Sequence, residues 1–306
     1  MKMRTAGIIF LFGSGVWYSG ALTAASAESI TTAGGAKYEH KLEMSRFELG
    51  DGVHHETEGP FERVVGEKGV FLVDKVTGAT LAVRNSSLSP KPPIVPKAGD
   101  TNSSQSPTYP QPLTKNSDEH SAAVRAYLVA AGVPEAEVNG THVTTTMAGG
   151  GPVRDGLQPS QSKLLWYTTH LERSLGGIPV EGSYAFAALD SDSNVITEGV
   201  YWPAIPASVV YKAQALEERL ASPGGKAAFL ATVRKAQSDV GDAAGGVKIV
   251  HTPAGYHGTF QAKAVYSVVV PSAAGGKAQI QQFDETGARV RLNDEMSKRI
   301  DSVKLK

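Results

Sequence analysis

A proline-rich stretch divides the chain. Seven of the 17 prolines in the 306-residue sequence lie between Ser87 and Ser117, mixed with Ser, Thr, Asn, Gln and Lys. Because proline fixes φ and has no backbone N–H, such a stretch cannot join a helix or the interior of a sheet. Its composition is typical of an extended, semi-rigid spacer, with a short proline ligand for another domain as the alternative. The sequence thus predicts a linker at 87–117, between a small region containing a β-hairpin at 28–86 and a larger domain at 118–306.

The N-terminus has the pattern of a bacterial export signal. Lys2 and Arg4 precede an apolar run at 6–12, and the small residues Ala25-Ser26-Ala27 follow. This order predicts a signal peptide at 1–27 with cleavage after Ala27, and a secreted or periplasmic protein with no membrane attachment after cleavage. The alternative is an uncleaved anchor, but glycine and serine dilute the apolar run.

The composition excludes several function classes. The chain has 30 Lys and Arg against 30 Asp and Glu, so there is no electrostatic reason to expect a nucleic-acid partner. It has no cysteine, which excludes disulfides, thiolate zinc ligands and a cysteine nucleophile. No cofactor-binding fingerprint or Gly-x-Ser-x-Gly elbow occurs, so we expect no cofactor and no catalytic residues.

The larger domain shows alternating helix and strand signals. Helical spacing of apolar residues predicts a helix after a cap at Ser117 or Asp118, ending at Gly132. Alternating or β-branched segments joined by short turns predict antiparallel strands. We therefore expect an α+β fold, an antiparallel sheet with packed helices, with further helices at 208–220 and from 223 and strands at 141–147, 163–173, 182–190, 194–202, 260–270, 279–283 and 288–292.

One turn pattern recurs three times. The segments 73–79 and 283–288 share an apolar residue, Asp, a spacer and Thr-Gly-Ala, and 189–195 is a looser version with Asn in place of Gly. The Asp side chain can accept hydrogen bonds from the turn backbone, and Gly or Asn tolerates the left-handed conformation. The pattern predicts three similar hairpins.

The segment 171–183, Leu-Glu-Arg-Ser-Leu-Gly-Gly-Ile-Pro-Val-Glu-Gly-Ser, is followed by an alternating strand and the turn at Asp190. This order resembles the propeptide modules of secreted thermolysin-like and fungalysin-like metalloproteases, which belong with the PepSY-type domains. The resemblance covers about 164–203 and implies a propeptide-like α+β fold. In that family the module assists folding of the attached protease and inhibits it. The sequence has no His-Glu-x-x-His, so we expect any such action to be on a separate secreted peptidase.

The densest set of metal-ligating residue types lies in the N-terminal region, at Asp51, His54, His55, Glu56 and Glu58. Adjacent histidines point to opposite sides of a strand and do not readily share one ion. We therefore interpret this set as exposed polar residues and predict no metal site. Ser160 and Lys163 fit a Ser-x-x-Lys pattern, but Pro159 and the strand-like residues that follow favour a chance match.

Three function classes remain open: a secreted non-catalytic binding or inhibitory module, a secreted hydrolase with a dispersed active site, and an envelope or matrix interaction protein. The resemblance favours the first. A Ser–His pair or two convergent carboxylates in a pocket would favour the second. For the first class, the predicted partner contact comprises the glycine-containing turn, a nearby cation and two tryptophans whose alternative role is core packing: Arg173, Gly176, Gly177, Ile178, Pro179, Trp166 and Trp202.

Overall fold

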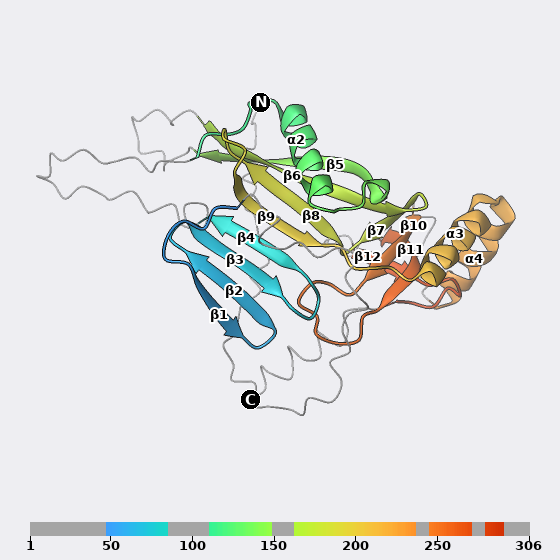
Figure 1. Ribbon diagram of the computed structural model, residues 1–306. Coiled ribbons are helices and arrows are strands. Elements are labelled where there is room, and N and C mark those ends of the chain that lie inside the picture. Colours follow the sequence, from blue (N-terminus) through green and yellow to red (C-terminus); the bar gives the residue numbers. More distant parts are fainter. Residues whose placement is uncertain (1–46, 85–109, 149–161, 237–244, 271–278, 291–306) are drawn as a thin grey trace, which may run out of the picture. The chain divides into compact units, whose positions relative to one another are not determined.

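The computed structural model describes residues 47–84, 110–148, 162–236, 245–270 and 279–290 (Figure 1). The predicted signal peptide at 1–27 and the linker up to residue 109 lie outside the described residues, as does the Ser160 of the Ser-x-x-Lys match. Within the described part of the chain, no helix has the length and apolar character needed to cross a membrane.

The described strands form a single twelve-stranded sheet. Its order is β1-β2-β3-β4-β9-β8-β6-β7-β10-β11-β12, and β5 pairs with β6 beside this path. All pairings are antiparallel except β7 with β10, which is parallel. The strands are β1 (His54–Glu58), β2 (Phe61–Gly66), β3 (Gly69–Asp74), β4 (Thr80–Arg84), β5 (Val138–Ala148), β6 (Lys163–Leu175), β7 (Ile178–Glu181), β8 (Tyr184–Leu189), β9 (Val195–Tyr201), β10 (Gly245–His251), β11 (Ala262–Val270) and β12 (Gln279–Phe283).

Three α-helices and a short 3-10 helix are described. Asn116 caps the first, because its side chain accepts hydrogen bonds from the backbone of Asp118 and Glu119, so the cap lies one residue before the predicted position. Helix α2 (Ser117–Ala130) contacts β5, β6 and β8, and helix α3 (Ala207–Ala221) contacts β7, β10 and β11 (Figure 1). The helices are α2 (Ser117–Ala130), η2 (Glu135–Glu137), α3 (Ala207–Ala221) and α4 (Pro223–Ala236).

The predicted fold class is wrong. We expected a helix-packed α+β fold of the propeptide type, with a separate small β-rich segment before it. The described residues form mostly a mixed twelve-stranded sheet, 47% strand and 24% helix, and contain only three α-helices. The difference arises at two long-range pairings: β4 pairs with β9, which joins the N-terminal strands to the main sheet, and β7 pairs with β10, which extends the sheet to β12.

The three predicted turns are confirmed. The Asp74 carboxylate accepts hydrogen bonds from the backbone of Val76 at 3.0 Å and Thr77 at 3.3 Å. Asp284 accepts in the same way from Thr286 at 2.9 Å. In the third turn Asp190 accepts from Asp192 at 3.0 Å and Asn194 at 2.9 Å. The left-handed residue there is Ser193, with φ 63°, and not the predicted asparagine. The carboxylates satisfy turn amides that would otherwise lack partners.

The end of the predicted linker is ordered against one of these turns. Pro112 forms an isolated bridge with Asp190, and the backbone N–H of Ser191 donates to the carbonyl of Gln111 at 3.0 Å. Leu113 donates to the carbonyl of Leu189 at 3.3 Å. The described part of the predicted linker therefore runs along the β8–β9 hairpin and leads directly into α2.

The main core lies between α2 and the adjoining face of the sheet. Val124, Tyr127 and Leu128 of α2 pack against Ala185 and Ala187 of β8. A second set of buried residues joins α3 and α4 to β11 and β12, and includes Leu216, Phe229 and Tyr266. The helices thus bury their apolar faces on different parts of one sheet.

Candidate functional site

A buried ion pair lies where β6 ends. Arg173 and Glu137 are each 4% exposed. Arg173 Nε donates to Glu137 Oε2 at 3.0 Å, and Nη2 lies 2.9 Å from the same oxygen. Trp202 Nε1 also donates to this oxygen, at 2.9 Å, and its ring centroid lies 4.9 Å from the Arg173 guanidinium carbon. Burial lowers the pKa of Arg173 to about 10, so the guanidinium is still charged at neutral pH.

The ion pair extends into a polar network. Arg173 Nη1 donates to Ser183 Oγ at 2.8 Å and to the carbonyl of Pro203 at 2.9 Å. Ser183 Oγ lies 2.8 Å from Nε2 of His251, whose Nδ1 lies 2.8 Å from the carbonyl of Thr252. Because that carbonyl can only accept, Nδ1 carries the proton and Nε2 accepts from Ser183. Burial lowers the pKa of His251 to about 4, so its imidazole is neutral at neutral pH.

A cleft of about 530 Å³ opens above the ion pair. The end of β6 and η2 provide its charged floor, and the first turns of α3 with the segment before them provide its walls. Most of the lining side chains are apolar, and Tyr211 on the wall is 73% exposed. The lining residues are Glu137, Arg173, Leu175, Ala204, Ile205, Ala207, Val210, Tyr211 and Gln214.

The predicted contact residues at 176–179 lie beside this cleft but differ in exposure. Gly176 and Gly177 form the exposed turn between β6 and β7, with φ of 57° and 85°, and Pro179 is exposed on β7. A Cβ at Gly176 would lie 2.4 Å from Gln214 Nε2, so the turn packs closely against α3. Ile178 is fully buried among residues of β10, β11 and α3.

The two predicted tryptophans are both buried. Trp202 is 1% exposed, and Trp166 is 8% exposed in a small cluster with Leu165, Ala188 and Ile196. This burial agrees with the core-packing alternative. The fold brings Arg173 and Trp202 together at one site, where both side chains are buried. Trp166 lies elsewhere on the sheet.

The network contains residues that the sequence analysis did not select. Glu137, Ser183 and His251 lie 36, 10 and 78 positions from Arg173. No local spacing relates them, because β-strand pairing brings them together. The residues around 137 and 173 include further charged and polar side chains, so the sequence carries no local signal for a buried ion pair there.

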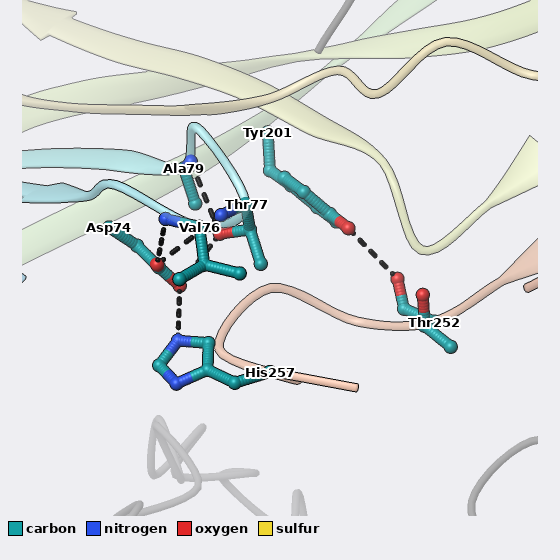
Figure 2. Close-up of polar contacts among 7 residues, drawn as sticks. All are labelled: Asp74, Val76, Thr77, Ala79, Tyr201, Thr252 and His257. Atoms are coloured by element: carbon teal, nitrogen blue, oxygen red, sulfur yellow. Dashed lines mark hydrogen bonds and ion pairs between the residues drawn. The ribbon is translucent and has the colours of Figure 1, made fainter. Parts of the chain in front are cut away.

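A second polar cluster ties the loop between β10 and β11 to the N-terminal strands (Figure 2). His257 Nε2 lies 2.9 Å from Asp74 Oδ2, which also accepts from Thr77 Oγ1 at 2.7 Å. Tyr201 donates its hydroxyl to the carbonyl of Thr252 at 3.2 Å. Asp74 is 3% exposed and its oxygens are occupied by the turn and His257, so we interpret the cluster as structural.

The acidic and histidine-rich set in the N-terminal region is not gathered around one point. His54 contacts Glu56 at 3.0 Å, whereas His55 contacts Glu62 at 3.5 Å, so the adjacent histidines turn to different partners. Among the described residues, no group of three or more His, Asp or Glu could hold a metal ion.

Comparison with known proteins gives no relative. No family model matches the sequence, and no curated protein or solved structure matches it. The resemblance of 164–203 to the protease propeptide modules therefore stays a prediction.

Proposed function

We propose that the protein is a secreted, non-catalytic binding module that holds an apolar segment of another extracellular protein, such as a secreted peptidase, in the cleft formed by the end of β6, η2 and the first turns of α3. The observation that carries this proposal is the combination of mostly apolar lining residues with a buried, hydrogen-bonded ion pair. Such pockets, with a few fixed polar groups in a largely apolar lining, are typical of binding sites.

The charge of the floor indicates which chemistry the cleft accepts. The Arg173 guanidinium is already neutralised by Glu137 and is held by Ser183 and the Pro203 carbonyl. A free carboxylate would have to compete with Glu137, so a neutral segment with an apolar side chain fits the floor better than an acidic one.

The rim supplies an anchor. Tyr211 is the most exposed of the large apolar or aromatic side chains on the described surface, and it lines the cleft. Tyrosines in such positions contribute strongly to binding because they bury a large area and lose little conformational entropy.

The Ser183–His251 pair favours a second candidate, a serine hydrolase. The direction of its hydrogen bonds fits proton transfer from Ser183 to His251. The pKa of His251 near 4 makes the imidazole a weak base at neutral pH, however, and Arg173 holds the serine oxygen. We therefore expect a fluorophosphonate probe to leave Ser183 unlabelled; labelling that disappears in Ser183→Ala would favour the hydrolase.

The binding proposal is tested with a cleft-filling variant. We expect the immobilised wild-type protein to retain a defined protein from culture supernatant, and Ala207→Trp to lose it, because the indole would occupy the cleft. Ala215→Trp is the matched control, because Ala215 is exposed on the same helix but does not line the cleft. Equal retention by all three proteins would contradict the proposal.

A further inference from the structure

β5 has an open edge in the part of the chain that the structure describes. It pairs with β6 on one side, and no described strand pairs with its other side. The other edges of the sheet are β1 and β12, which are five residues long, whereas β5 has eleven residues. An open edge presents backbone N–H and C=O groups that another strand can pair with.

The centre of β5 is regular. Register shifts occur near its two ends, between Val138 and Gly140 and between Thr146 and Met147. Between them the pairing with β6 runs without interruption from Gly140 opposite Glu172 to Thr146 opposite Trp166. Bulges bend a strand and interrupt an edge, so the regular stretch at 140–146 is the part of β5 that is shaped for pairing.

β5 also lacks the charged residues and prolines that usually protect an edge strand from pairing. Its sequence, Val-Asn-Gly-Thr-His-Val-Thr-Thr-Thr-Met-Ala, contains no Lys, Arg, Asp, Glu or Pro. The edge strand β1 contains Glu56 and Glu58, and it is protected in the usual way. Met147 of β5 is 49% exposed, which adds an apolar side chain to this edge.

We propose that two copies of this chain associate through β5, by antiparallel pairing of the two strands about a twofold axis near Thr144. In that register Thr144 lies opposite Thr144 of the partner subunit, and Thr145 lies opposite Val143 of the partner subunit. Antiparallel self-pairing is destabilised when like charges meet, and β5 has none. Threonine pairs across strands are favourable, and the strand has four threonines. A second copy is therefore the occupant that the edge fits, and the contact is symmetric and closed.

The proposal does not depend on the binding function of the cleft. Sedimentation equilibrium of the purified protein tests association through β5. We expect it to show a monomer–dimer equilibrium at concentrations up to about 100 µM. Thr145→Lys places a charge on the exposed centre of the strand in both copies, and should raise the dimer dissociation constant at least ~10-fold. Thr57→Lys, an exposed threonine on β1, is the matched control and should leave the constant unchanged.

Hydrogen exchange distinguishes a loss of folding from a loss of pairing. Amides of β5 should gain protection as wild-type protein is concentrated, and those of β1 should not. A wild-type monomer over the whole range, a dimer without added protection of β5, or equal effects of the two lysine variants would each overturn the proposal.

Discussion

Arg173 Nε and the Glu137 carboxylate lie 3.0 Å apart at the end of β6, each side chain almost completely removed from solvent, and Trp202 donates its indole N–H to the same carboxylate oxygen. The three residues come from β6, η2 and the chain just after β9. Their contacts therefore fix the junction of these segments and make the floor of the cleft.

Removing one partner of this ion pair should destabilise the fold more than removing the charges of both partners. We expect Arg173→Met to destabilise the protein by about 3–5 kcal/mol, because it leaves a buried carboxylate without its cation. Adding Glu137→Gln should recover about 1–3 kcal/mol, since the neutral amide still accepts from Trp202. Urea unfolding of the single and double variants measures both effects. A double variant less stable than Arg173→Met would contradict this account.

The protein should lose stability when the pH falls from about 7.5 to about 5. Burial lowers the pKa of His120 and of His251 to about 4, against about 6.5 in an unfolded chain. The Nε2 of His120 accepts from the backbone N–H of Leu189, so protonation would remove an acceptor. The unfolded chain thus binds more protons, and stability that is complete above pH 6.5 is lost as the pH falls towards 4, by about 2 kcal/mol per histidine at pH 5.

Urea midpoints at the two pH values check this prediction. Burial lowers the pKa of His170 to about 4 as well. His120→Gln should therefore reduce the pH dependence by about a third, because His170 and His251 then remain to titrate. An unchanged slope in the variant would show that other groups cause the loss.

The first two residues of β7 should differ sharply in their effect on stability. Ile178→Ala should cost about 2–4 kcal/mol, because the side chain is fully buried and its removal leaves a cavity. Pro179→Ala should cost less than about 1 kcal/mol, because Pro179 is exposed. Thermal unfolding of the two variants provides the comparison, and similar melting temperatures would mean that Ile178 is not a core residue.

Much of the local structure was predictable from the sequence. The strand at 163–173 is observed as β6, the helix at 208–220 as α3, and the helix from 223 begins at Pro223. These elements have strong periodicity or a clear start signal, which act over a few residues. The Asp-containing turns were predictable for the same reason, because the carboxylate and the amides that it binds are at most four positions apart.

The sheet as a whole was not predictable in this way. The pairing of β4 with β9 joins residues more than a hundred positions apart, and β7 has only four residues, at which we predicted no strand. The register of such strands depends on contacts that no local pattern encodes. The candidate site has the same origin, since Ser183 and His251 are 68 positions apart and meet only because β7 pairs with β10.

Photo-crosslinking from the rim of the cleft tests the central claim most directly. Tyr211, replaced by p-benzoylphenylalanine, should form a covalent adduct with the captured protein, because this side chain lines the cleft and is exposed. The same replacement at Thr232, exposed on α4 and outside the cleft lining, should give no adduct. An adduct from Tyr211 alone that is abolished by Ala207→Trp is the result the account predicts, and capture of a partner with no adduct from Tyr211, or with equal adducts from both positions, would contradict it.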